Sequence, residues 1–170
     1  DEEIDSILST GIEVKKNISV GKDISFDDIT KEYDATYISI GAHADKKIGI
    51  EGEDAKSGIT SAVEMLRAIG DGDMPDYTGK KVIVIGGGNV AMDAARTALR
   101  LGGETHIVYR RSEEELPARK EEVHHAKEEG IIFDLLTIPV EILVDENAWV
   151  KGVKCIKMEL GEPDASGRRR

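Results

Sequence analysis

A run of three glycines between a short apolar segment and a helical pattern constrains the fold of this chain most strongly. The β-branched apolar segment, residues 82–85, is typical of a strand that is buried on both faces. The glycines occupy 86–88, and small or apolar residues then recur at helical spacing over 89–101. Two further glycines at 102–103 end the helix, and residues 105–109 resume as a strand. This order predicts a strand–turn–helix–strand unit.

The turn has the spacing G-x-G-x-x-A, with Gly86, Gly88 and Ala91 at its three key positions. In this pattern the first glycine permits a tight turn, the second lets the backbone approach a pyrophosphate, and the small third residue lets the helix lie against the strand. The start of the helix offers unpaired N–H groups and a partial positive charge to phosphates. Because the elements follow in this order within about thirty residues, we predict a dinucleotide-binding site; the alternative is an α/β turn without a ligand.

The end of the second strand indicates which dinucleotide binds. Sites for NAD usually place an Asp or Glu there, about twenty residues past the glycines, where it hydrogen-bonds the ribose 2′-hydroxyl. This chain has Arg110 and Arg111 instead. Guanidinium groups bind a 2′-phosphate through charge-assisted, often bidentate hydrogen bonds, so we predict NADP(H). The alternative is a solvated pair of arginines that is neutralised by the acids that follow, Glu113, Glu114 and Glu115.

Composition argues against several classes of function. The 170 residues carry a formal net charge of −11, which disfavours binding to nucleic acid or to an anionic membrane surface. No apolar run approaches the ~20 residues that span a bilayer, and no signal peptide is visible. The single cysteine, Cys155, excludes an internal disulfide and a CxxC redox pair. We expect a cytoplasmic protein without a nucleic-acid or membrane partner.

Side chains that commonly hold metals or act in catalysis are not grouped in this sequence. The adjacent His124 and His125 point about 100° apart on a helix, so we predict no metal site. His106 lies in the middle of a predicted strand, where we expect it to be packed. No Ser/His/Asp or Cys/His arrangement indicates a nucleophile, and we predict no catalytic residue.

The pattern along the chain predicts an α/β protein with a Rossmann-like three-layer nucleotide-binding domain, a parallel sheet and a small β-meander. The predicted helices are 1–10, 26–32, 57–69, 89–101 and 117–129, with Pro117 at the first position of the last one. The other predicted strands are 12–14, 33–40 and the meander strands 131–136, 140–144 and 150–160. Residues 43–54 are polar and contain glycine, which predicts a linker.

Both ends of the sequence fall within polar, charged stretches. The sequence begins without Met inside a charged helical pattern, and residues 167–170 read Gly-Arg-Arg-Arg after a polar run. We therefore expect these residues to be part of a longer protein.

A resemblance to a known family rests on two runs, GGGNVAMDAARTALRLG and VYRRSEEELPARKEEVHHAKEEG. They resemble the nicotinamide-nucleotide domain of the glutamate synthase small (beta) subunit family, a branch of the two-dinucleotide-domain flavoproteins that also includes thioredoxin reductase. Two other runs of this chain also match the family. The run GIEVKKNISVGKDISFDDITKEYDATYISIGAH resembles the last part of the flavin domain, and the run IEGEDAKSGITSAVEMLR resembles the start of the inserted nucleotide domain. The resemblance covers about 2–160. Its most specific part is Tyr-Arg-Arg at 109–111 followed by Leu-Pro-Ala-Arg at 116–119.

The resemblance implies two domains and an activity. Residues 1–45 correspond to the C-terminal part of a flavin-domain segment, and 46–170 to an inserted NAD(P)H-binding domain. The protein is then the NADPH-binding portion of a flavin-dependent oxidoreductase, which passes hydride between NADP(H) and FAD and on to iron–sulfur centres or a partner subunit. Rotation between the domains, through the linker at 48–58 and the other crossing segment, follows from the same resemblance.

The resemblance also implies which residues bind cofactors. The pyrophosphate-binding turn matches Gly86, Gly87, Gly88, Asn89, Val90 and Ala91. The 2′-phosphate residues match Arg110 and Arg111, with Arg119 as a third contact. The alternative for Arg119 is a surface arginine paired with Glu115 or Glu122.

Two further matches concern the nicotinamide and the flavin. Asp93 matches an acid near the nicotinamide carboxamide, although an exposed acid favoured by the helix macrodipole explains it equally well. Gly41 and Ala42 match the crossover where the chain passes near the flavin.

The sequence departs from the family's pattern in its flavin-binding parts. The family's flavin domain opens with its own G-x-G-x-x-G, often with an upstream cysteine cluster for iron–sulfur centres, and closes with a further flavin-contacting segment; none of these is in the 170 residues. We expect FAD in the intact protein, no tight binding of FAD by these residues alone, and no disulfide reductase activity.

Two other functions compete with this hypothesis. A non-catalytic nucleotide-sensing module would share the glycine turn but would need no flavin domain. A free-standing NADP dehydrogenase would need a Tyr/Lys or His/Asp set beside the nicotinamide, and the sequence indicates none.

Overall fold

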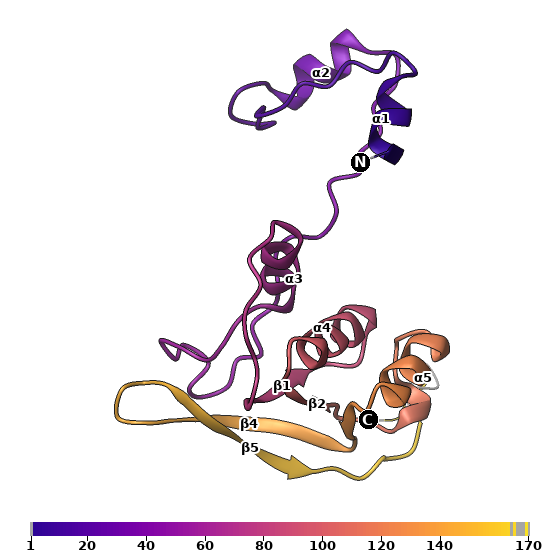
Figure 1. Cartoon of the computed structure of the whole chain (residues 1–170). Coiled ribbons are helices and arrows are strands. Elements are labelled where there is room, and N and C mark those ends of the chain that lie inside the picture. The colour runs from indigo at the N-terminus through magenta and orange to yellow at the C-terminus, as the bar shows by residue number, and fades with distance from the viewer. Residues whose placement is uncertain (1, 164, 166–168, 170) are drawn as a thin grey trace. The chain divides into compact units, whose positions relative to one another are not determined.

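The chain forms two compact units, Asp1–Gly41 and Ala42–Arg170. The computed structural model describes residues 2–163, 165 and 169, so most of the predicted arginine-rich end lies outside the described residues. The elements in chain order are α1 Glu2–Leu8, α2 Phe26–Glu32, α3 Ala62–Gly70, β1 Lys81–Ile85, α4 Asn89–Arg100, β2 Glu104–Val108, the 3₁₀ turn η1 Glu113–Glu115, α5 Lys120–Glu128, β3 Ile132–Asp134, β4 Thr137–Val144 and β5 Val150–Lys157 (Figure 1).

The first unit contains the two short helices but not the strands that we predicted. Helix α2 begins after Ser25, whose hydroxyl accepts the backbone N–H of Asp28 at 3.0 Å. Residues 33–40 do not form the predicted strand, and neither do 12–14. A strand needs a neighbour to pair its N–H and C=O groups, and none of the described residues provides one. The β-prone side chains therefore stay in solvent, with Tyr37 91% exposed.

The second unit is built on a parallel sheet in the order β1-β2-β3. Lys81 lies opposite Glu104, and His106 lies opposite Ile132 in the next pair. We predicted that 131–136 would be the first strand of a meander, but it joins the parallel sheet as β3. The reason is that β3 follows helix α5 in a second strand–helix–strand crossover. The remaining strands, β4 and β5, pair as an antiparallel hairpin.

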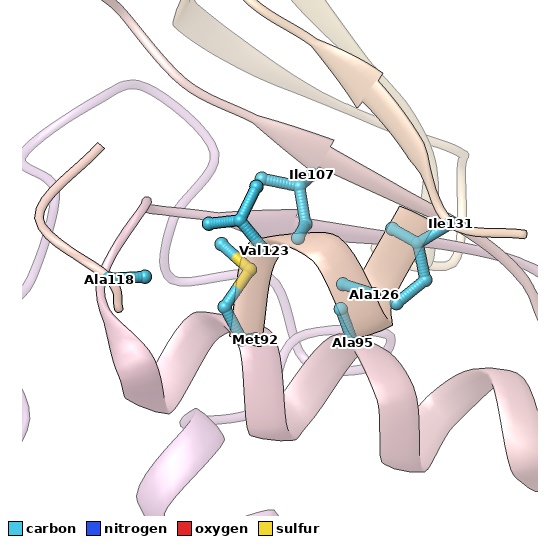
Figure 2. Packing of buried hydrophobic residues seen from close by; sticks show 7 residues of the cluster. All are labelled: Met92, Ala95, Ile107, Ala118, Val123, Ala126 and Ile131. Carbon is cyan, nitrogen blue, oxygen red and sulfur yellow. The ribbon is translucent and has the colours of Figure 1, made fainter. Parts of the chain in front are cut away.

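The three predicted layers are present in this unit. Helices α4 and α5 cover one face of the parallel sheet, and the β4–β5 hairpin crosses the other (Figure 1). The buried cluster lies between the sheet and the two helices (Figure 2). It consists of Met92, Ala95, Ile107, Ala118, Val123, Ala126 and Ile131. The fold is therefore mixed α/β and Rossmann-like, as the sequence predicts.

Helix α5 begins later than we predicted. Its first residue is Lys120 and its N-cap is Arg119, so Pro117 lies before the helix. Leu116 is extended, with φ −61° and ψ 123°, as expected before proline. The helix does not start at Pro117 because the Ala118 N–H donates to the Gly87 carbonyl at 3.1 Å, which keeps this segment extended. The Ser112 hydroxyl and backbone N–H both donate to the carboxylate of Glu115, which caps the separate turn η1.

The predicted linker at 48–58 is partly attached to the second unit. The Glu51 carbonyl accepts the N–H of Ile142 at 2.8 Å, and the Ser57 carbonyl accepts the N–H of Val150 at 3.1 Å. Both donors lie in the β4–β5 hairpin, so 51–57 runs along it rather than free in solvent. Helix α3 accordingly starts at Ala62, several residues later than predicted.

Glu129 links the two helices that cover the sheet, and this link makes stability depend on pH. Its carboxylate accepts Arg100 at 2.7 Å and Arg96 at 2.8 Å, and these hydrogen bonds hold the Glu129 pKa below its ordinary 4.5. A lowered folded-state pKa adds stability above the unfolded pKa, which is lost as pH falls through the folded pKa. We expect Glu129→Gln to lower the melting temperature at pH 7. The difference from wild type should shrink below about pH 4.5.

Thermal unfolding followed by circular dichroism at several pH values measures this effect. Glu121→Gln, on the exposed surface of the same helix, is the matched control and should change little. If Glu129→Gln lowered the melting temperature by the same amount at every pH, the loss of stability could not be assigned to the ion pairs of Glu129.

Candidate functional site

The glycine turn joins the end of β1 to the start of α4. Gly86 has a φ of 143°, which residues with a side chain rarely adopt. A Cβ at this position would lie 3.5 Å from the Cβ of Ala91, an ordinary contact. Ala91 is 8% exposed, so a larger residue there would push the helix away from the turn. The backbone thus requires glycine at 86, and the packing requires a small residue at 91.

Gly87 and Gly88 differ sharply in their surroundings. A Cβ at Gly87 would lie 2.7 Å from both the Tyr109 ring and the Leu116 side chain, so the protein's own packing requires glycine there. Gly88 has extended backbone angles, φ −88° and ψ 177°, and a Cβ there would meet no atom within 4 Å. Neither conformation nor internal packing explains glycine at 88.

The N–H groups at the start of α4 are free within the described part of the chain. Those of Gly88, Asn89 and Val90 donate to no acceptor among the described residues, whereas Ala91 and Met92 donate to the Gly88 carbonyl at 3.0 and 3.1 Å. Asn89 and Val90 are exposed. Three successive free donors at a helix start provide the geometry that binds an anion.

Arg110 and Arg111 follow β2 beside the turn. Within 4 Å, neither guanidinium meets a carboxylate among the described residues, whereas Arg67, Arg96 and Arg100 each form an ion pair. The backbone of Arg111 is held by the N–H of Leu136, which donates to its carbonyl at 3.0 Å. Two guanidiniums, one of them on a residue whose backbone is held by this hydrogen bond, are thus available to an external anion.

The neighbouring acids are engaged elsewhere. Glu113 pairs with Lys127 at 2.6 Å, and Glu115 accepts both donors of Ser112. The alternative in which these acids neutralise the arginine pair is therefore not found for Glu113 or Glu115.

Arg119 is exposed at the N-cap of α5 rather than in the first helical turn. Its guanidinium also has no carboxylate partner in the described part of the chain, and its alternative partner Glu122 binds Arg96 at 2.8 Å. Its backbone N–H donates to Oδ1 of Asn89 at 2.9 Å. The predicted third cation is thus attached to the first residue of α4.

The structure gives less information about the predicted roles of Asp93, Gly41 and Ala42. Asp93 is exposed one helical turn after Asn89, and its charge raises the pKa of Arg96, after the larger effects of Glu129 and Glu122. Gly41 and Ala42 lie at the division between the two units, and Gly41 has a φ of 69°.

His106 lies on the opposite face of the sheet from the helices. Its Nδ1 is 2.8 Å from the Asp134 carboxylate, and its Nε2 is 3.1 Å from Glu104. The two residues Asp134 and His106 help to line a cavity of about 280 Å3 between the sheet and the hairpin. This is a His/Asp pair that the sequence did not indicate, but it faces the hairpin, whereas the glycine turn leads into α4 on the other face.

The described residues provide neither a cluster of metal ligands nor a membrane-spanning helix. The described part of the chain has no group of three or more His, Cys, Asp or Glu side chains arranged to hold a metal ion. No described helix is long and apolar enough to cross a bilayer.

Comparison with known proteins identifies the family. The family model described as pyridine nucleotide-disulphide oxidoreductase matches residues 2–164. The chain belongs to this family. Within the pyridine nucleotide-disulphide oxidoreductases, the predicted resemblance to the glutamate synthase small subunit is confirmed by the Glutamate synthase [NADPH] small chain of Escherichia coli K12. It is 42% identical over 172 residues, which cover 94% of this chain and 36% of that protein.

A second curated relative and a solved structure extend the comparison. The NADPH-Fe(3+) oxidoreductase subunit beta of Geobacter sulfurreducens is 46% identical over 171 residues, 99% of this chain and 25% of that protein. The structure of Mycobacterium tuberculosis FprA in complex with NADPH has a TM-score of 0.72, 20% identity, and 99% coverage of this chain against 53% of its own. This second likeness shows the fold. The chain spans about a quarter of the length of the Geobacter relative.

Sequence reasoning missed the contacts around the turn. The sequence places Tyr109 at the end of a strand and in the specific run Tyr-Arg-Arg, but it does not indicate that the Tyr109 ring packs over Gly87 or that the Tyr109 hydroxyl donates to the Glu115 carbonyl at 2.7 Å. Asn89 was read as part of the turn, and its bond to Arg119 spans 30 positions. One feature of the sequence could have indicated this bond. Asn89 has a short polar side chain and directly follows Gly88, an N-cap without a side chain that could accept a backbone N–H.

Proposed function

We propose that the second unit binds NADP(H), with the glycine turn on the pyrophosphate and Arg110 and Arg111 on the 2′-phosphate. The observation that carries the proposal is Gly88, where neither packing nor a positive φ requires glycine and three N–H groups without an acceptor among the described residues adjoin an open position. The two guanidiniums, which meet no carboxylate among the described residues, add the specificity for a phosphorylated ribose. Similar proteins from Geobacter and Escherichia carry NADPH in their names.

The activity that fits this site is that of a flavin-dependent oxidoreductase. The chain is then the NADPH-binding portion, and hydride passes between NADP(H) and FAD and on to iron–sulfur centres or a partner subunit. Nicotinamide and flavin cofactors supply the hydride chemistry, while the residues of this chain bind and orient. No residue here is assigned a catalytic proton transfer.

Several finer assignments belong to the same proposal. Residues 1–45 form the end of a flavin-domain segment and 46–170 the nucleotide domain, with Gly41 and Ala42 near the flavin and Asp93 near the nicotinamide carboxamide. Since 51–57 is bonded to the hairpin, rotation between the domains would use the residues before Glu51 and the other crossing segment. Cross-linking the domains in either orientation should therefore stop turnover, and full turnover in both would contradict the rotation.

A nucleotide-sensing module is the second candidate function. The same free N–H groups and arginines would bind NADP(H) there, and occupancy would control a partner. Reduction of a bound flavin by NADPH distinguishes the two, because a sensor shows nucleotide binding without flavin reduction.

Calorimetric titration of this chain with NADPH, NADH and FAD, each separately, tests the binding proposal. We expect tight binding of NADPH, weaker binding of NADH and negligible binding of FAD. Equal or tighter binding of NADH, unaffected by Arg110→Ala, would overturn the assignment of the arginines.

A further inference from the structure

Asn89 uses its side chain to reach another element instead of its own helix. The N-cap of α4 is Gly88, which has no side chain, and Asn89 is the first helical residue. Its Oδ1 accepts the backbone N–H of Arg119 at 2.9 Å, across 30 positions of sequence. An exposed amide thus joins the start of α4 to the N-cap of α5.

The segment leading to Arg119 is attached to the glycine turn at two more points. The Ala118 N–H donates to the Gly87 carbonyl at 3.1 Å, and Ala118 itself is 8% exposed in the buried cluster that also contains Met92 (Figure 2). The Leu116 side chain packs against the Cα of Gly87, since a Cβ there would lie 2.7 Å from it. These contacts therefore fix residues 116–119 relative to the glycine turn.

Both cationic segments touch the same glycine. The Tyr109 ring lies over Gly87 and is followed directly by Arg110. Ala118 bonds to Gly87 and is followed directly by Arg119. Because Arg119 has no carboxylate partner among the described residues, its bond to Asn89 fixes where the side chain begins without neutralising its charge.

We propose that Asn89 is a positioning residue, which places Arg119 so that its guanidinium contributes to recognition of the 2′-phosphate. The inference rests on the proposed function. A neutral amide suits this task, because its oxygen accepts the Arg119 N–H without placing a negative charge beside a bound diphosphate. Aspartate would provide the acceptor but would repel the diphosphate.

The test measures NADP+ and NAD+ binding to the full-length protein by calorimetry, so that no flavin is reduced during the titration. For Asn89→Ala we expect the affinity for NADP+ to fall about tenfold, as for one weakened charge-assisted hydrogen bond, with NAD+ changed less than about twofold. Asn89→Asp should weaken both nucleotides while keeping the wild-type ratio of their affinities. A merely structural role for Asn89 would weaken both in Asn89→Ala.

Coupling to Arg119 is tested in the same assay. In an Arg119→Ala background, Asn89→Ala should cause no further change in the ratio of NADP+ to NAD+ affinity. Asn147→Ala, an exposed asparagine in the β4–β5 turn, is the matched control and should bind both nucleotides as wild type does. Melting temperatures of all variants confirm folding.

Different outcomes contradict different statements. Equal losses for both nucleotides in Asn89→Ala, or additive effects with Arg119→Ala, would overturn the positioning role. A wild-type protein that binds neither nucleotide, or prefers NAD+, would overturn the proposed function itself.

Discussion

Replacing Gly88 by valine should remove binding of NADP+ and NAD+ alike while leaving the protein folded. The position is open, with no atom within 4 Å of a Cβ, and its backbone angles suit any residue. A side chain there would occupy the place where a pyrophosphate approaches the free N–H groups of Gly88, Asn89 and Val90. Each charge-assisted hydrogen bond lost costs about 10- to 100-fold in affinity, so we expect both affinities to fall at least about a hundredfold.

The matched comparison is Gly87→Ala, one residue earlier. Its Cβ would lie 2.7 Å from the Tyr109 ring, which the hydroxyl bond to the Glu115 carbonyl holds in place. Overpacking of this kind costs about 1–3 kcal/mol. We therefore expect Gly87→Ala to lower the melting temperature clearly, whereas Gly88→Val loses the N-cap preference for glycine over valine, worth about 1 kcal/mol, and creates no steric clash.

Calorimetry and thermal unfolding together separate the two positions. Loss of binding in Gly88→Val, with a protein that still folds cooperatively, would mean that a ligand rather than packing requires the glycine. Wild-type affinity in Gly88→Val would mean that nothing is seated on this turn, and the proposed function would fail.

The β1–α4–β2 part of the second unit was predictable because the sequence patterns that specify it are local. Short-range patterns decide where β1, α4 and β2 lie: a β-branched run, three glycines, a helical period and two more glycines. The arginine pair was likewise visible at the end of β2. The sequence does not show that the two arginines lack carboxylate partners among the described residues, because three acids follow within five positions. Only the structure shows that Glu113 and Glu115 bind elsewhere.

The errors occurred where an element depends on a distant neighbour. Residues 33–40 have the composition of a strand, yet no described residue pairs with them. Strand β3 has a composition that also fits a meander, and its place was decided by the helix that precedes it. The sequence predicts Pro117 in a helix because the preference of proline for a first helical turn is a local signal. The bond from Ala118 to Gly87, which keeps the segment extended, joins residues far apart in sequence and leaves no local signal.

Removing both guanidiniums, in Arg110→Ala with Arg111→Ala, should separate the two nucleotides. The 2′-phosphate would lose its charge-assisted and bidentate contacts, so we expect the affinity for NADP+ to fall about a hundredfold or more. NAD+ lacks this phosphate, and its affinity should stay within about twofold of wild type. Arg67→Ala, at an exposed arginine paired with Asp71 on α3, is the control.

The dependence on pH identifies the phosphate as the group recognised. A phosphate monoester loses its second proton near pH 6, whereas a guanidinium remains charged throughout the accessible range. The wild-type affinity for NADP+ should therefore weaken as pH falls below about 6, because the dianion becomes a monoanion. The NAD+ affinity should not follow this trend, and the double variant should lose most of it. If the variant kept the full pH dependence, another group would be binding the phosphate, and Arg110 and Arg111 would be ordinary surface charges.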